Sequence, residues 1–399
     1  MNRFFEIQDA LRFKFALIIL FIIGSACSSV DEQHSLSMVD ANANQITVNL
    51  YENLHSFSGD GVMFGHQATL WYGYHWHADD LQEGESRSDV KDVTGSYPAI
   101  YGWDIADFLR AQYSDEEIEE RMKQSVEWVR QGYERGGIIT YAWHMSNPVT
   151  DDSFYDTTNA VYAIIPGGEL HDKYRGILDT VADFFQRIDP IPVIFRPYHE
   201  HNGDWFWWGK DIATEEEYIE LWQFTVEYLR DEHGVNNLIW AFSPDRSRID
   251  IDNFKEVYMY GYPGDDYVDI IGLDNYWDLG HPANETPPEQ QFEEFVRSLG
   301  YTVEIAEEMG KVAALTETGL EAIPDSTWWT NVMLEGLMSN EMTRKITYFQ
   351  VWRNANYERE NWDHFYAPFP GQASADNFVE FRNHPFVYFE DDLPDMYSD

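Results

Sequence analysis

The chain of 399 residues has a single cysteine and few basic residues. One cysteine excludes a disulfide framework and a zinc site built from several thiolates. Only 26 Lys and Arg residues stand against 71 Asp and Glu residues, which gives a formal net charge of −45 at pH 7. With so few cations the chain is poorly suited to rows of phosphates, so we expect no nucleic-acid partner, and anionic lipid or acidic polysaccharide is disfavoured as well.

Apolar and aromatic residues, in contrast, are abundant. Hydrophobic residues make up 44% of the chain and aromatic residues 16%. A disordered acidic chain is poor in both classes, so the composition predicts a globular protein with a large core. It also favours an uncharged partner that has flat apolar faces.

The N-terminus has the pattern of an export signal. Basic residues precede an apolar run at 15–23, which is followed by Gly24, Ser25, Ala26 and Cys27. The run is shorter than the roughly 20 apolar residues that a membrane-spanning helix needs. Basic, apolar and small residues in this order are typical of a secretory signal. The only cysteine resembles the lipidated cysteine of a bacterial lipoprotein, although Gly24 replaces the usual large aliphatic residue, and ordinary cleavage after Ala26 is the alternative.

The sequence therefore predicts a signal peptide at 1–26, a flexible polar tether at 27–45 and one domain at 46–399. We expect the protein in the bacterial cell envelope or at the cell surface as a lipoprotein, or otherwise periplasmic or secreted. Its membrane contact would be the lipid on Cys27 alone, and we expect a monomer.

Eight short apolar runs, rich in β-branched and aromatic residues, recur along the domain. They span residues 61–67, 98–104, 137–144, 191–200, 237–245, 268–276, 311–317 and 346–353. Such near-continuous apolar runs are typical of parallel strands that are covered on both faces. Helical patterns lie between most of them, at 114–134, 171–188, 214–233, 288–309 and 326–338. This order predicts an α/β fold, a (β/α)₈ TIM barrel. A doubly wound open sheet is the alternative, but its usual Gly-x-Gly-x-x-Gly turn does not occur in the sequence.

Polar residues stand at the ends of these runs, where barrels of this type carry their chemistry. They are His66, Asp104, His144, His199, Glu200, Asp274, Tyr276, Glu317, Trp352 and Arg353. Glu200 ends the fourth run and Glu317 the seventh, so we expect the two carboxylates to face each other across the barrel mouth. Retaining glycosidases hold such a pair about 5–5.5 Å apart, one as acid/base and one as nucleophile. For either glutamate alone, a salt bridge is the simpler interpretation.

Four consecutive aromatic residues, 205–208, follow Glu200 closely. Such a run suits neither one face of a helix nor one face of a strand. It could seal a loop onto the barrel, or it could offer flat rings that stack on the C–H face of a pyranose.

The segment 196–209 (RPYHEHNGDWFWWG) resembles the acid/base signature of glycoside hydrolase family 26, the family of many bacterial β-mannanases. The segments 64–67, 88–104, 143–148, 272–276, 315–319 and 351–355 resemble further motifs of that family, in order. The resemblance implies a retaining (β/α)₈ enzyme that uses no cofactor and no metal. Its partner would be a neutral β-linked polysaccharide of the mannan class, cleaved internally at β-1,4-mannosidic bonds in mannan, glucomannan or galactomannan.

By that resemblance Glu200 is the general acid/base and Glu317 the nucleophile. The other implied sugar contacts are His199 beside the acid, Tyr276 near the nucleophile, His144 and Trp205 at the cleavage point, Phe242 on the leaving-group side, Trp352 and Arg353 on the non-reducing side, and Asp274 nearby. Arg196 is expected to form an internal ion pair beneath the site. The sequence departs from the family pattern at His201, where an apolar residue such as Met is usual.

Two other functions are alternatives. His-x-His pairs at His75/His77 and His199/His201 could bind zinc in a metal hydrolase, but such barrels usually carry the pair on the first strand. A surface glycan-binding lipoprotein could use the same aromatic residues without chemistry, yet it would have no reason to keep both glutamates. Within the glycosidase interpretation, β-1,3-xylan, mixed-linkage β-glucan and exo-acting release of mannobiose stay open.

Overall fold

The computed structural model describes residues 37–82 and 84–399. Cys27, the expected signal peptide and the first part of the expected tether lie outside the described residues. At the centre stand eight parallel strands: β1 (Val62–Gln67), β4 (Ile100–Asp104), β5 (Ile138–Trp143), β6 (Val193–Pro197), β7 (Leu238–Phe242), β8 (Ile270–Asn275), β9 (Val312–Thr318) and β10 (Tyr348–Val351). Each pairs with the next, and β10 pairs with β1, so the ring is closed and the predicted barrel is confirmed.

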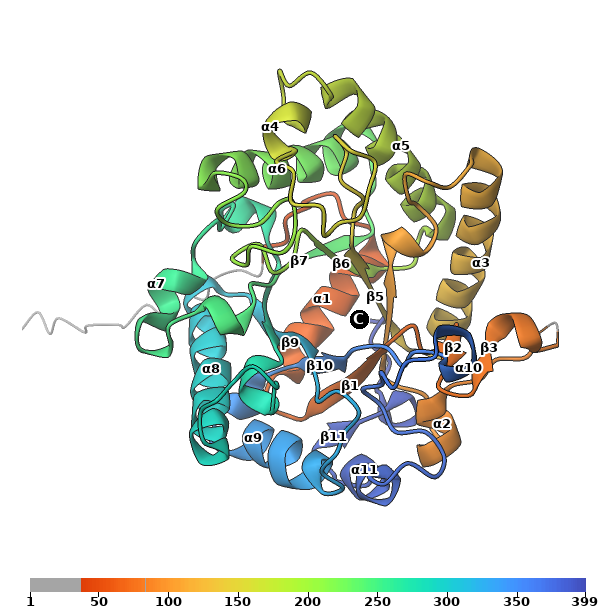
Figure 1. The fold of residues 1–399 in the computed structure, drawn as a ribbon, viewed down its shortest axis with the longest axis vertical. Helices are drawn as coiled ribbons and strands as arrows, with labels where there is room; N and C mark the ends of the chain where they lie inside the picture. The colour runs from red at the N-terminus through yellow and green to blue at the C-terminus, as the bar shows by residue number, and fades with distance from the viewer. Residues whose placement is uncertain (1–36, 83) are drawn as a thin grey trace, which may run out of the picture. The chain divides into compact units, whose positions relative to one another are not determined.

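Helices surround the barrel (Figure 1). The α-helices of the described residues are α1 (Gln45–Phe57), α2 (Asp89–Thr94), α3 (Asp115–Glu134), α4 (Val161–Ile164), α5 (His171–Ile188), α6 (Glu215–Glu227), α7 (Phe254–Tyr258), α8 (Pro288–Met309), α9 (Glu335–Met338), α10 (Tyr357–Glu360) and α11 (Ala375–Arg382), and all but α1 lie around the strands. Among the described residues there are also three short strands, β2 (Tyr72–Gly73), β3 (Trp76–His77) and β11 (Val387–Tyr388). Strands β2 and β3 form a hairpin, and β11 pairs with β1. No helix among the described residues is long and apolar enough to cross a bilayer.

Successive residues of each barrel strand contribute to two different cores. In β7, Ile239 and Ala241 belong to an inner cluster inside the barrel, whereas Trp240 and Phe242 belong to an outer cluster beneath the helices. This alternation follows from the pleat of a strand, which sends successive side chains to opposite faces. It explains why the runs are apolar at nearly every position.

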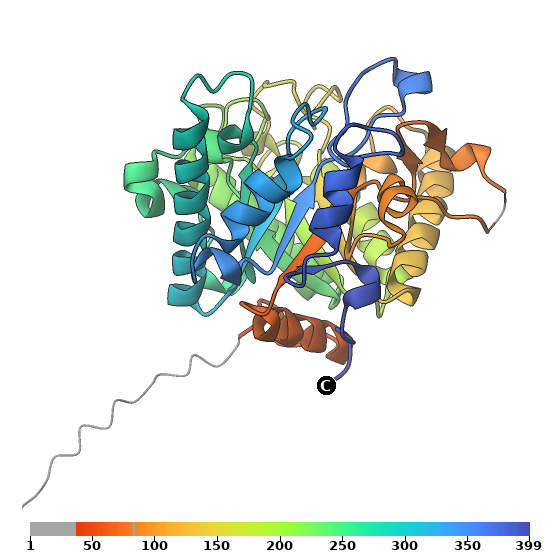
Figure 2. The same ribbon diagram turned by 90° about the horizontal axis from the view of Figure 1, so that it is seen from below.

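Helix α1 closes the N-terminal end of the barrel, below the strands in Figure 2. Its Leu50, Tyr51 and Leu54 pack with the first inward residues of the strands, such as Met63 and Ile270. Full burial of side chains of this kind contributes roughly 1.5–3 kcal/mol each. Because α1 covers the N-terminal end of the barrel, a ligand can enter only from the opposite, C-terminal end.

The chain already packs on the barrel at Val39, before residue 46, where the sequence predicts that the domain begins. Val39 and Asp40 are buried, and the Val39 N–H donates to Asp269 Oδ1 at 2.8 Å. The Asn44 N–H donates to the carbonyl of Asn236 at 2.9 Å, and the Asn44 side chain caps α1. The predicted tether at 27–45 is therefore too long at its C-terminal end, because a polar segment can still be held by hydrogen bonds to the barrel.

Candidate active site

Two adjoining hollows open at the C-terminal end of the barrel. The wide hollow has a volume of about 1100 Å³ and is lined by Glu200, Trp205, Asp245, Tyr276 and Tyr366, among others. The narrow hollow, of about 520 Å³, is lined by residues that include Asp104, His144, Trp352 and Arg353. Tyr155 and Trp362 line both, so the two hollows meet there.

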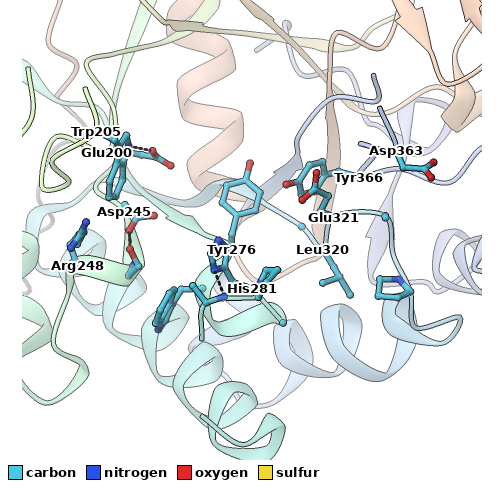
Figure 3. A pocket seen from close by; sticks show the side chains of 18 of the residues that line it. Glu200, Trp205, Asp245, Arg248, Tyr276, His281, Leu320, Glu321, Asp363 and Tyr366 are labelled. Carbon is cyan, nitrogen blue, oxygen red and sulfur yellow. Dashed lines mark hydrogen bonds between the residues drawn. The ribbon is translucent and has the colours of Figure 1, made fainter. Parts of the chain in front are cut away.

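In the wide hollow, Tyr276 stands between two groups of side chains (Figure 3). Glu200, Trp205 and Asp245 lie on one side of it, and Glu321 and Tyr366 lie on the other.

A β-bulge in β9 turns Glu317 into the barrel. Leu273 of β8 is opposite Leu315, but Asp274 is opposite Glu317, so Thr316 is an extra residue in β9. Leu315 belongs to the outer core, whereas both Thr316 and Glu317 bond to groups inside the barrel. Strict alternation would point Glu317 outward, beside Leu315. Bulges commonly redirect a side chain next to an active site in this way.

Glu317 is held by two donors, one on each carboxylate oxygen. Arg196 Nη2 donates to Oε1, and the Tyr276 hydroxyl donates to Oε2 at 3.1 Å. Arg196 Nη1 also donates to Asp274 Oδ2 at 2.8 Å. The internal ion pair expected for Arg196 is thus confirmed, and it involves two carboxylates. Burial raises the pKa of Asp274 well above its usual range, although the Arg196 charge opposes this rise.

Glu200 stands in a turn three residues beyond β6 rather than at the end of a strand. Tyr198 and Glu200 have φ values of 48° and 54°, a left-handed backbone that is uncommon for residues other than glycine. The Glu200 N–H donates to the Ser243 carbonyl at 2.8 Å, which ties the turn to the end of β7. Strain of this kind persists where surrounding contacts enforce it, often at active sites.

The surroundings of Glu200 favour its protonated form. Burial raises the pKa of Glu200 well above its usual range, and the charges of Asp245, Asp274 and Glu317 raise it further. Trp205 Nε1 donates to Glu200 Oε2 at 2.8 Å and opposes the rise. A carboxylic acid that keeps its proton near neutral pH suits a general acid.

Two histidines lie beside the glutamates. The His144 N–H donates to Asp104 Oδ1 at 3.0 Å, and its ring Nδ1 bonds to Asp104 Oδ2. Burial alone would raise the pKa of Asp104, but the contact with His144 and the hydrogen bonds lower it overall. His199 Nε2 is 3.9 Å from Glu317 Oε1, and burial lowers the His199 pKa well below its usual value. His199 therefore stays neutral in the site.

Trp352 and Arg353 lie in the narrow hollow with His144. The Trp352 ring is 5.7 Å from the His144 ring. Arg353 donates through both Nη atoms to Glu360, at 2.9 and 2.8 Å. This pair fixes the guanidinium at the wall of the hollow.

Phe242 does not reach either hollow, so the prediction that it lines the leaving-group side is wrong. It is 0% exposed and packs against His201 and Trp222, with ring distances of 4.8 and 5.8 Å. The reason is the alternation within β7, which sends Ala241 inward and Phe242 toward the helices.

The aromatic run after Glu200 divides between its two possible roles. Phe206, Trp207 and Trp208 are buried, and the two indoles donate to the carbonyls of Met145 and His199, each at 2.9 Å. These three residues seal the loop onto the barrel. Trp205 alone of the four lines the wide hollow.

The histidine pairs do not form metal sites in the described structure. His199 faces Glu317, whereas His201 donates to the Tyr260 carbonyl and stacks on Tyr218. His75 Nδ1 bonds to Glu358 at 2.7 Å, and His77 Nδ1 accepts from the Asp79 N–H.

One group of potential ligands does converge in the site. Within residues 37–82 and 84–399, His199, Asp274 and Glu317 bring ligand atoms within 4.8 Å of one another. Arg196 already donates to both carboxylates, however, so a cation occupies the position between them. The donor set therefore suits a guanidinium better than a metal ion.

Sequence reasoning missed the residues that reach the site from long loops. Tyr155, Tyr366 and Trp362 line the hollows but follow no apolar periodic pattern. The Tyr366 ring is 5.6 Å from that of Tyr276. Only the folding of the loops brings these side chains to the glutamates.

Comparison with known proteins gives consistent matches. The sequence pattern described as glycosyl hydrolase family 26 matches residues 39–367. A mannan endo-1,4-beta-mannosidase of Bifidobacterium adolescentis is 33% identical over 299 residues, which are 73% of this chain and 28% of that protein. Another of Bacillus subtilis strain 168 is 32% identical over 286 residues, 67% of this chain and 74% of that protein. The chain thus matches little more than a quarter of the length of the first relative.

Solved structures agree in fold and sequence. A GH26 beta-mannanase from Bacteroides ovatus has a TM-score of 0.77 and 37% identity, covering 89% of this chain and 98% of that chain. A protein named GH26C from a Muricauda species has a TM-score of 0.79 and 35% identity, covering 90% of this chain and 96% of that chain.

Proposed function

The chain belongs to glycosyl hydrolase family 26, and from this premise we propose that it is a retaining endo-β-1,4-mannanase. Its substrates would be mannan, glucomannan or galactomannan. The names of the two curated relatives, both mannan endo-1,4-beta-mannosidases, support this choice. The main support is that the two glutamates have different surroundings. Glu317 lies beside the Arg196 guanidinium, whereas burial raises the pKa of Glu200.

In the proposed reaction Glu317 attacks the anomeric carbon while Glu200 gives its proton to the departing glycosidic oxygen. The bond between the sugar and the leaving group breaks, and a covalent glycosyl-enzyme forms on Glu317. Glu200, now a carboxylate, then takes a proton from water, which attacks the anomeric carbon and releases Glu317. Arg196 and Tyr276 orient the two oxygens of Glu317 for the attack.

The narrow hollow would hold the non-reducing side of the chain, with Trp352 stacking on a pyranose and Arg353 bonding to hydroxyls. His144, His199 and Trp205 would surround the sugar at the cleavage point. The wide hollow would hold the leaving-group side. Asp274 would act through Arg196, since its carboxylate is buried beneath the guanidinium.

A panel of linear mannan, galactomannan, β-1,3-xylan and lichenan tests the substrate. Oligosaccharides of mixed length from mannan support endo-mannanase action, whereas mannobiose alone would indicate an exo-acting enzyme. Cleavage of β-1,3-xylan or lichenan but not mannan would contradict the proposal.

The mechanism is tested separately, by the configuration of the first-formed product. Proton NMR during hydrolysis should show the β-anomer before mutarotation, and initial formation of the α-anomer would contradict retention. Glu317→Ala should remove nearly all activity. Glu200→Ala should impair aryl glycosides with good leaving groups far less than mannan, because they need little acid assistance.

We also propose that the protein is exported and anchored through a lipid on Cys27, and that it acts as a monomer. The support is the order of basic, apolar and small residues that ends at Cys27. Cys27→Ser should move the protein from the membrane fraction to the soluble exported fraction. Mass spectrometry of the mature N-terminus distinguishes this from cleavage after Ala26, which would leave Cys27 without a lipid.

A further inference from the structure

Two aromatic side chains stand exposed where the hollows meet. Tyr155, in the loop after β5, is 61% exposed, and Trp362, in the loop after β10, is 50% exposed. Each lines both the wide and the narrow hollow. Strands β1 and β4 lie between β5 and β10 in the ring, so the two rings come from separate parts of the barrel rim.

Both rings are held in place although they are exposed. The Trp362 indole stacks on the His364 imidazole at 3.9 Å and 20°. His364 Nδ1 bonds in turn to Glu321 at 2.6 Å. Tyr155 stacks on Phe206 at 5.6 Å and 27°. Rings that are stacked on one side present their other side without a further loss of side-chain freedom.

On the Trp362 side, aromatic contacts lead from the rim to the nucleophile. His364 and Tyr366 have ring centres 5.2 Å apart, and those of Tyr366 and Tyr276 are 5.6 Å apart. Tyr276 then donates to Glu317 at 3.1 Å. The position of Trp362 is therefore fixed relative to Glu317.

The Tyr155 side has a similar arrangement. Phe206, on which Tyr155 stacks, has its ring 5.4 Å from both His144 and His199. His199 lies next to Glu317 in turn. The two exposed rings thus belong to the same rigid frame as the site itself.

We propose that Tyr155 and Trp362 form an aromatic gate, a two-sided binding site for β-linked pyranose units where the bound chain passes from the narrow to the wide hollow. Each ring takes the flat C–H face of one sugar, because an aromatic face complements an uncharged apolar surface. The proposal rests on the proposed function, since it assumes a chain that occupies both hollows. The gate would favour chains long enough to reach both rings.

Kinetics on a linear hexasaccharide test the gate. In Trp362→Ala and in Tyr155→Ala, KM should rise by about three- to tenfold for each ring, with kcat changed less than twofold. Trp362→Phe and Tyr155→Phe should retain most of the affinity, because phenylalanine keeps a flat face. Tyr162→Ala is the matched control: Tyr162 is 51% exposed but lines neither hollow, so KM should stay unchanged.

Binding measured by calorimetry in a Glu317→Gln background gives the second readout. The double variant Tyr155→Ala/Trp362→Ala should bind the hexasaccharide about ten- to a hundredfold more weakly than that background alone. Unchanged affinity and KM in the double variant would overturn the gate, and so would a fall in kcat at constant KM.

The hexasaccharide is taken from whichever polysaccharide of the panel the unaltered enzyme cleaves best. If that is not mannan, the proposed substrate fails while the gate is still tested on the true one. If mannan is cleaved and the double variant binds normally, the gate fails alone.

Discussion

Arg196 and Glu317 form an ion pair inside the barrel, with side chains that are only 3% and 5% exposed. Arg196 comes from β6 and Glu317 from β9, and the same guanidinium also pairs with Asp274 of β8. Side chains from three strands, β6, β8 and β9, thus meet at one buried cation. The pair links the stability of the barrel to the orientation of the Glu317 carboxylate, the nucleophile of the proposed mechanism.

Arg196→Met should destabilise the protein by about 3–5 kcal/mol and abolish activity, because it leaves two buried carboxylates without their cation. Urea unfolding measures the first effect and hydrolysis of mannan the second. Arg297→Ala removes a surface pair with Asp252 and should cost less than about 1 kcal/mol. A stability loss as small as that for Arg196→Met would contradict the role given to this ion pair.

Trp205→Phe should move the alkaline limb of the pH–rate profile to higher pH. In the proposed mechanism Glu200 acts as an acid in its protonated form, so activity should fall as pH rises through its pKa. The Trp205 N–H lowers that pKa by bonding to the carboxylate, and removing it raises the pKa.

The measurement is kcat/KM against pH on mannan. Trp277→Phe is the control, because Trp277 lines the same hollow but does not donate to Glu200. A shift of the limb to lower pH in Trp205→Phe would show that the hydrogen bond does not act on Glu200.

Asp104→Asn should lower kcat by about 10- to 100-fold, because the carboxylate fixes the orientation and the tautomer of His144. His144→Ala should cause a comparable loss. In the double variant the two losses should not add, because each substitution by itself already disrupts the same Asp104–His144 pair. Additive losses would mean that Asp104 acts on the reaction without His144.

Thr316→Val should destabilise the protein by about 1–3 kcal/mol and lower activity. The Thr316 hydroxyl donates to Asp274 Oδ1 at 2.7 Å, and valine would leave this buried oxygen without a partner. Thr316→Ser keeps the hydroxyl and should cost only about 1 kcal/mol for the missing methyl group, with activity retained. Equal activity losses in the two variants would exclude the hydrogen bond as the cause.

Added NaCl should raise the melting temperature. The formal net charge of −45 implies repulsion between surface carboxylates. Salt screens that repulsion, because the Debye length falls from about 30 Å at 0.01 M to about 3 Å at 1 M. A series at fixed pH tests this, and a melting temperature that falls with salt, or precipitation, would contradict it.

The sequence was sufficient to predict the barrel. Each strand carries the apolar pattern of a segment that is buried on both faces, and that pattern is local, since it follows from the pleat of the strand. Glu200, Glu317, His144 and Trp352 stand at the ends of such runs, and Trp205 belongs to the aromatic run that follows Glu200. The structure places Glu200, Trp205, His144 and Trp352 in the lining of the two hollows, and Glu317 is buried against Arg196.

The sequence could not reveal which way a side chain points where regular alternation ends. Phe242 is a different case: the family resemblance alone assigned it to the leaving-group side, whereas the alternation in β7 continues to its last residue and sends the ring toward the helices. The exposed rings of Tyr155 and Trp362 were missed because the course of a long loop depends on contacts far away in sequence.

The sequence by itself thus determined the strands and most of the reactive residue types of this protein, because both depend on short-range patterns of burial. Only the tertiary structure decided that Glu317 faces into the barrel, toward Arg196. Alternation alone would send it outward beside Leu315, and the extra residue Thr316 in β9 reverses that direction. The bulge depends on how β9 pairs with its neighbours and on the hydrogen bonds of Arg196 and Asp274, which exist only once the barrel has closed.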